Sequence, residues 1–108
     1  MPNIEAERAV ALAIIDRGLA KGFAVNVLYE GLQRAFDTFT TDREAIAREL
    51  VATDLDVVVF AQKPAQDPRW ARRGSITFVW GNGPDEVAAD YSDNIYMREL
   101  VEGLPAAA

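Results

Sequence analysis

The sequence predicts one small α+β domain built on a mainly antiparallel sheet. Segments with the 3.6-residue periodicity of amphipathic helices alternate with short segments whose apolar residues recur at every second position. The chain has 108 residues and is 50% hydrophobic, enough for one modest core. The order helix, strand, strand, helix, strand, strand, helix predicts a four-stranded sheet with its helices mostly on one face.

A first amphipathic helix is predicted over residues 3–21, with Asn3 as its N-cap and Gly22 as its stop signal. Its apolar side chains spread over more than half of the circumference, so it should pack against more than one apolar neighbour. Packing against a sheet and another helix is one interpretation. The other is a homodimer or partner interface that includes Leu12 and Leu19.

A hairpin is predicted next. Residues 23–30 alternate as a strand does, and a turn at Gly31 leads into a second arm over residues 32–39. Arg34 and Asp37 lie among the apolar residues of that arm, which is typical of a sheet edge or of a partly solvated face.

A second, short helix is predicted to begin at Thr41. Thr41 and Glu44 have the spacing of a capping box, in which each side chain binds the backbone N–H of the other residue. The apolar side chains that follow, at 46, 47, 50 and 51, form one stripe, so this helix should cover one face of the sheet.

Two further strands are predicted at residues 57–60 and 75–80. The first is apolar on both faces, as a central strand is, and the second alternates. The loop of residues 63–74 separates them and contains two prolines, which cannot donate ladder hydrogen bonds. We expect the two strands to pair across this loop.

A final helix is predicted to start at Pro84, after the Gly81–Gly83 turn, and to fray over residues 105–108. Its apolar side changes near residues 92–94. A bend or restart of the helix is one explanation, because Ser, Asp and Asn favour caps. A straight helix buried on two sides is the other.

Composition narrows the possible functions. The chain contains neither His nor Cys, which removes the commonest general base, thiolate chemistry and the usual transition-metal ligands. No cofactor and no metal site is expected, and catalysis would depend on carboxylates, Lys, Ser, Thr or Tyr. With 17 acidic and 11 basic residues the net charge is −6, which disfavours nucleic acid and anionic membranes as partners. No apolar run suits a membrane span and no export signal is present, so a cytoplasmic protein is predicted.

Two features of the C-terminal part, a glycine turn and a set of acidic residues, are interpreted as structural. The Gly81–Gly83 turn resembles a phosphate loop only in its glycines, because no Lys follows and Asp85 and Glu86 occupy the place of the anion. The acids of the last segment could mimic a phosphate backbone or collect a divalent cation, but their spacing matches no calcium loop, so a solvated helix face is expected. They are Asp85, Glu86, Asp90, Asp93, Glu99 and Glu102.

One basic cluster is the strongest candidate for a partner site. It consists of Lys63, Arg69, Trp70, Arg72 and Arg73. Arginines beside an aromatic ring can stack on a base or bind an acidic partner. The alternative interpretation is internal: Trp70 folds back over the sheet, and the arginines neutralise the acids of the predicted last helix.

Residues 78–91, Phe-Val-Trp-Gly-Asn-Gly-Pro-Asp-Glu-Val-Ala-Ala-Asp-Tyr, resemble the C-terminal part of a group of small uncharacterised bacterial and phage-associated proteins. The resemblance implies a bacterial cytoplasm or a mobile element as the setting. It implies no activity and no site residue.

These observations predict a non-enzymatic protein–protein interaction or regulatory protein, with a protein partner or a second copy of the chain. A nucleic-acid-binding module using the loop of residues 63–73 is one alternative, decided by where Trp70 and the arginines point. A small carboxylate-dependent enzyme or divalent-metal binder is another, decided by whether acids converge in a pocket.

Overall fold

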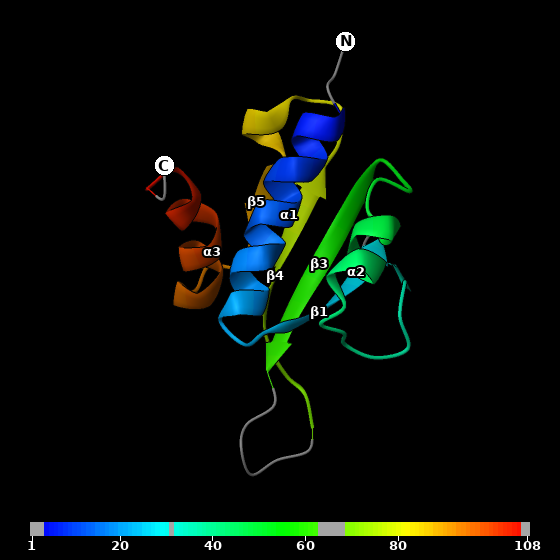
Figure 1. Ribbon diagram of the computed structural model, residues 1–108, viewed down its shortest axis with the longest axis vertical. Coiled ribbons are helices and arrows are strands. Elements are labelled where there is room, and N and C mark those ends of the chain that lie inside the picture. Colours follow the sequence, from blue (N-terminus) through cyan, green and yellow to red (C-terminus); the bar gives the residue numbers. More distant parts are fainter. Residues whose placement is uncertain (1–3, 31, 63–68, 107–108) are drawn as a thin grey trace.

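An antiparallel sheet of five strands and three α-helices make up residues 4–30, 32–62 and 69–106, the part of the chain that the computed structural model describes (Figure 1). In chain order the elements are α1 (Ile4–Ala20), β1 (Ala24–Tyr29), β2 (Gln33–Arg34), α2 (Arg43–Glu49), β3 (Leu55–Gln62), β4 (Ala71–Val79), the 3-10 turn η1 (Pro84–Glu86), β5 (Ala88–Tyr91) and α3 (Ile95–Ala106). The strand order in the sheet is β2-β1-β3-β4-β5. The predicted α+β class with an antiparallel sheet is confirmed.

The predicted four-stranded sheet is wrong, because part of the predicted last helix is a fifth strand. η1 and β5 occupy residues 84–91, and α3 begins only at Ile95. Asn94 starts the helix: its Oδ1 accepts a hydrogen bond from the Met97 N–H at 3.0 Å. The change of apolar side near residues 92–94 therefore marks the junction between a strand and a helix.

The helices share one core on one face of the sheet. Alternate strand residues such as Val27, Val58 and Ile76 are fully buried and meet Ile14 of α1, Ile46 of α2 and Leu100 of α3 in that core. In Figure 1, α1 and α2 lie across the same side of the sheet. We call the opposite side the helix-free face. Its side chains include Leu28, Val57, Val59, Thr77 and Val79.

The first helix approaches the sheet closely. A Cβ added to Gly18 would lie 2.7 Å from a ring carbon of Phe60, and α1 also packs against α3. The helix ends where predicted, since Gly22 follows it with φ of +92°. Asn3 lies outside the described residues. Leu12 and Leu19 are partly buried against the core, and the interface that they were expected to form stays a prediction.

The second arm of the hairpin is shorter than predicted. Only Gln33–Arg34 pairs as a strand, and Thr40 rejoins β1 through a bridge to Val25. Between Arg34 and Thr40, side-chain hydrogen bonds of Asn26 replace the backbone hydrogen bonds of the sheet. The Asn26 amide donates to the Phe36 carbonyl at 2.9 Å and accepts from the Phe36 N–H at 3.2 Å. Residues 35–39 therefore leave the sheet as a loop.

The predicted cap of the second helix is wrong by one residue. Asp42 is the N-cap of α2, and its carboxylate accepts a hydrogen bond from the Ala45 N–H at 3.2 Å. With Asp42 at this position, Ala45 and not Glu44 is the third helical residue, so no capping box forms. The predicted stripe is also shortened, because α2 ends at Glu49.

Candidate functional site

A small hollow lies on the helix-free face, where the 35–39 loop meets the strands. Its volume is about 90 Å³. Pockets for small molecules typically measure about 300 Å³ or more, so this hollow is the size of a single side chain. We call it the arginine hollow. Its lining consists of Asn26, Leu28, Arg34, Asp37, Thr38, Phe39, Val59 and Arg72.

Two exposed arginines give the arginine hollow its positive charge. Arg34 belongs to the edge strand β2 and donates one hydrogen bond to the backbone carbonyl of Asp37 at 3.3 Å. Arg72 comes from β4, two strands away from β1. Neither guanidinium forms an ion pair with a carboxylate of residues 4–30, 32–62 or 69–106. Asp37 is the single acid in the lining, so positive charge predominates there.

A β-bulge separates Arg72 from Arg73. Phe60 pairs with Gly74 and Ala61 pairs with Arg72, which leaves Arg73 as the extra residue of β4. Arg73 turns toward α3: its guanidinium carbon lies 5.5 Å from the centre of the Tyr96 ring, and its Nε donates to Gln62 at 3.1 Å. Arg72 therefore lies at the arginine hollow, whereas Arg73 contacts α3.

Trp70 lies against the 35–39 loop, with its ring centre 5.6 Å from that of Phe39. This aromatic pair joins the chain before β4 to the loop beside β1. Since Phe39 also lines the arginine hollow, Trp70 supports one of its walls. The two ring planes are tilted by 54°, and both residues remain partly exposed.

The predicted basic cluster is thus only partly one site. Arg72 and Trp70 lie at or behind the arginine hollow, Arg73 points away from it, and Lys63 lies outside the described residues. Arg34, Phe39 and Asn26 were missed. One signal could have indicated them, namely an Asn in the middle of an otherwise apolar strand, where its buried side chain requires hydrogen-bond partners.

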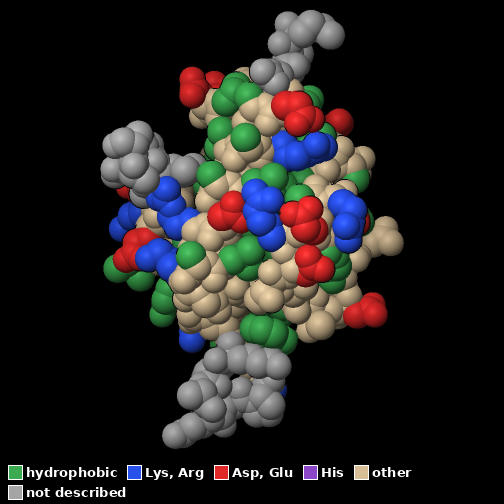
Figure 2. Space-filling view, viewed as in Figure 1, with side chains coloured by type: hydrophobic (Ala, Val, Ile, Leu, Met, Phe, Trp, Pro, Cys, Tyr) green, Lys and Arg blue, Asp and Glu red, His purple; other side chains and the backbone are tan. Residues whose placement is uncertain are grey.

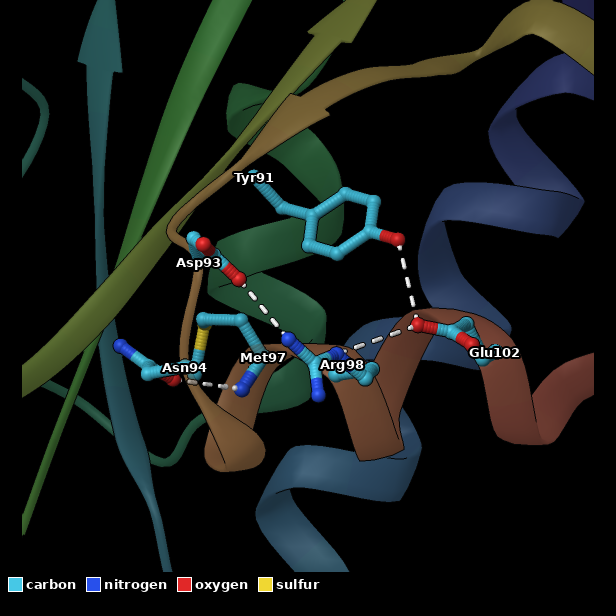
Figure 3. Close-up of polar contacts among 6 residues, drawn as sticks. All are labelled: Tyr91, Asp93, Asn94, Met97, Arg98 and Glu102. Carbon is cyan, nitrogen blue, oxygen red and sulfur yellow. Dashed lines mark hydrogen bonds and ion pairs between the residues drawn. The ribbon is translucent and has the colours of Figure 1, made fainter.

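The predicted neutralisation of the last helix by the basic cluster is wrong for Arg72 and Arg73. In the described part of the chain, the acids of α3 pair with other bases. Arg98 lies between Asp93 and Glu102, at 2.8 and 3.5 Å, and Lys21 of α1 reaches Glu99 at 3.1 Å. Figure 3 shows Arg98 between its two carboxylates, with the Tyr91 hydroxyl donating to Glu102 at 3.3 Å.

A second, wider hollow of about 350 Å³ lies beside η1 and contains Asp85 and Glu86 in its lining. The other four acids of the last segment do not line it, since Arg98 and Lys21 hold Asp93, Glu99 and Glu102, and Asp90 lies opposite Thr77 in the sheet. Within the described ranges, no group of three or more acidic side chains is arranged to hold a metal ion.

A buried carboxylate lies under the helical layer, at the end of β3. Asp56 is fully buried, and its Oδ2 accepts hydrogen bonds from the Val51 N–H at 2.9 Å and from the Trp80 indole at 3.0 Å. Its Oδ1 has no hydrogen-bond partner among the described residues. Burial raises the pKa of the Asp56 carboxyl above its usual value, and the charge of Glu49 raises it further.

Glu49 is also bound to Tyr29, the cross-strand neighbour of Asp56. The Tyr29 hydroxyl donates a hydrogen bond to the Glu49 carboxylate, which raises the pKa of Tyr29 to about 12. Two carboxylates and a phenol therefore meet at this end of the sheet. The arrangement offers no open cleft in which a substrate could reach Asp56.

The Gly81–Gly83 turn does hold an anionic group, and it comes from the protein itself. The Glu7 carboxylate of α1 accepts hydrogen bonds from the N–H groups of Gly81 and Gly83, at 2.6 and 3.2 Å. Glu7 is fully buried. The turn was predicted to be structural, and its backbone donors are used to anchor the first helix.

Similarity to known proteins adds no information on function. The chain matches no protein-family model, no curated protein and no solved structure at a significant level. The resemblance of residues 78–91 to phage-associated proteins therefore stays a prediction. No helix among the described residues is long and apolar enough to cross a bilayer.

Proposed function

We propose that this protein is a non-enzymatic interaction module that binds a partner protein through the helix-free face of its sheet. The observation that carries the proposal is the one-sided placement of the helices. They cover one face, while Leu28, Val57 and Val79 on the other face stay partly exposed and outside the core. Apolar side chains at alternate strand positions are typical of a sheet face that packs against something.

The two sides of the molecule differ in chemistry. The helical side, drawn in Figure 2, carries Lys or Arg and Asp or Glu side chains next to one another, as a solvated surface does. Arg43 of α2 and Asp16 of α1, 2.7 Å apart, are one such pair. The helix-free face instead combines apolar strand residues with the arginine hollow. Apolar area flanked by a few charges is a common composition for a protein interface.

Catalysis receives less support from the same geometry. The buried carboxylates Glu7 and Asp56 are engaged by backbone and indole donors inside the fold. The wider hollow beside η1 offers two exposed acids, with no Lys, Ser, Thr or Tyr in its lining to act beside them. The chain has no His and no Cys to complete such a site.

The setting of the module belongs to the proposal as well. A cytoplasmic location was expected from the sequence, and a phage or mobile element from the resemblance of residues 78–91. A second copy of the chain would also fit as the partner. The predicted interface that includes Leu12 and Leu19 of α1 would then be tested separately from the helix-free face.

Selection from a displayed library of genomic fragments of the source organism tests the proposal. The library is panned against the wild type, against Thr77→Lys on the helix-free face, and against Ala9→Lys on the exposed side of α1. Both variants add the same charge at a position that is at least partly exposed. Clones that bind the wild type and Ala9→Lys but not Thr77→Lys are expected. Selection of clones indifferent to Thr77→Lys, or of no specific clone, would overturn the proposal.

A further inference from the structure

We propose that the arginine hollow receives a carboxylate side chain of an extended acidic segment in the partner protein. This inference rests on the proposed function, because it names the chemistry by which the helix-free face would recognise its partner. It is carried by four properties of the hollow, namely its charge, its size, its rigidity and its place on the sheet.

The charge of the hollow calls for an anion. Arg34 and Arg72 approach it from different strands, and no described carboxylate neutralises either of them. Arg8, Lys21, Arg43 and Arg98 each hold an acid, whereas Arg17, Arg48 and Arg73 form no ion pair with a described carboxylate but do not line the hollow. In a chain of net charge −6, two unpaired arginines beside one hollow are available for an external carboxylate.

The size of the hollow restricts the anion. Its volume of about 90 Å³ is well below the roughly 300 Å³ at which pockets for small molecules begin. A nucleotide or a drug-sized ligand needs several times more space. A single acidic side chain fits, and its carboxylate can bind a guanidinium by two parallel hydrogen bonds.

Contacts within the chain hold the loop side of the hollow in place. Asn26 holds the 35–39 loop through two hydrogen bonds to Phe36, and the Phe39 ring is held by Trp70. The carbonyl of Asp37 holds Arg34. A site that is already ordered loses less conformational entropy on binding. A peptide that forms few contacts can therefore bind there.

The hollow also adjoins a partly exposed apolar strip. Leu28 lines it, and Val57 is the neighbour of Leu28 in the next strand of the sheet. A partner segment that crosses these strands can therefore place an acidic side chain in the hollow and an apolar one beside it. The inference thus commits to an extended segment in which an acidic and an apolar residue stand two positions apart, so that both side chains point toward the sheet.

Nucleic acid fits these features less well. A phosphate backbone brings a series of charges, and binding it requires a larger basic surface than two arginines within a chain of net charge −6. The aromatic rings nearest the hollow, Phe39 and Trp70, pack on each other at a tilt of 54°, which leaves less of each ring for base stacking. Nucleic acid is therefore kept as an outcome of the test.

Fluorescence anisotropy with synthetic probes tests the inference. The probes are a labelled octapeptide with the repeat Glu-Thr-Val-Thr, in which Glu and Val share one side of the extended chain, the same peptide with Gln in place of Glu, and a labelled oligothymidine. The proteins are the wild type, Arg72→Ala, Arg34→Ala, Thr77→Lys and Arg48→Ala. Arg48 is the matched control, because it is an exposed arginine of α2 on the helical side. Thermal unfolding monitored by circular dichroism establishes that each variant is folded.

We expect the Glu peptide to bind the wild type about tenfold more tightly than the Gln peptide, with the difference shrinking at high salt. Arg72→Ala and Arg34→Ala should each remove most of this difference, and Arg48→Ala should retain it. The reciprocal exchange gives a sharper check: Arg72→Glu should lose the Glu peptide and gain binding of a Lys peptide.

The possible failures can be told apart. Equal binding of the Glu and Gln peptides, no binding of either, or equal losses in Arg72→Ala and Arg48→Ala would overturn the inference. If Thr77→Lys still abolished binding of the selected genomic fragments, the proposed function would survive that result. Oligothymidine binding that is stronger than peptide binding and is lost in Arg72→Ala would overturn the acidic peptide in favour of nucleic acid.

Discussion

The Glu7 carboxylate binds the Gly81 N–H at 2.6 Å and thereby connects the first turns of α1 to the loop after β4. The two residues are 74 positions apart in the chain. Gly81 has φ of +97°, a conformation that glycine adopts without strain, and this conformation helps turn the backbone N–H groups toward the carboxylate. The contact lies at the end of the sheet where β4 ends and the chain continues into η1.

Glu7→Gln should destabilise the protein, because the amide supplies one acceptor where two N–H donors need one each. An unsatisfied buried donor costs about 1–3 kcal/mol, which is the expected loss in the free energy of unfolding. Urea denaturation measures it. Glu5→Gln is the matched control, since Glu5 is exposed and its ion pair among the described residues is with Arg8 at 3.4 Å. We expect a change below about 0.5 kcal/mol there. Equal effects in the two variants would contradict the anchoring role.

Sequence periodicity predicted the elements whose residues face the core. It misassigned the segments whose conformation depends on local hydrogen bonds. The apolar run at 57–60 and the alternation in 75–80 located β3 and β4, because a central strand is buried on both faces and a strand with one solvated face alternates. β5 was read as helix, since Val87 and Tyr91 are four residues apart and one short strand shows too few alternations. The arginine hollow depends on the contact of Asn26 with Phe36, which no periodicity encodes.

The cap of α2 provides a comparison of two adjacent residues. Asp42→Ala should lower the free energy of unfolding by about 1 kcal/mol, because the Ala45 N–H loses its acceptor. Thr41→Ala should have a smaller effect, since Thr41 is exposed and precedes the cap. Denaturant midpoints, measured at unchanged slope, decide between them. A larger loss for Thr41→Ala would restore the predicted capping box.

Gly18→Ala should destabilise the protein, although the same change in most helices is favourable by about 1 kcal/mol. The new Cβ would lie 2.7 Å from the ring of Phe60, which is fully buried and cannot move aside freely. We expect a net loss of about 1–3 kcal/mol, as for other overpacked cores. Ala9→Gly on the exposed side of α1 should cost about 1 kcal/mol from helix propensity alone. A stabilised Gly18→Ala variant would show that α1 lies farther from β3.

The buried Asp56 should make stability depend on pH in a defined direction. Its folded-state pKa is raised above the ordinary 3.8 by burial first and by the charge of Glu49 in addition, while the Val51 N–H and the Trp80 indole act in the opposite sense. Tyr29 lies across the strand from it. At a pH between the two values the folded protein keeps a proton that the unfolded chain has lost. The stabilisation by this proton is therefore complete below pH 3.8 and is lost as the pH rises through the folded-state pKa.

Asp56→Asn cannot titrate at this position, so the wild type should lose stability relative to Asp56→Asn as the pH rises from 3.8 through the folded-state pKa, and the difference should then stay constant. Urea denaturation of both proteins from acidic to neutral pH measures the difference, and carboxyl carbon NMR follows Asp56 directly. In Glu49→Gln the pKa of Asp56 should fall, because the neighbouring negative charge is gone. A constant stability difference between the wild type and Asp56→Asn over this range would mean that Asp56 is solvated in the folded protein. Its Oδ1 would then have solvent as a partner.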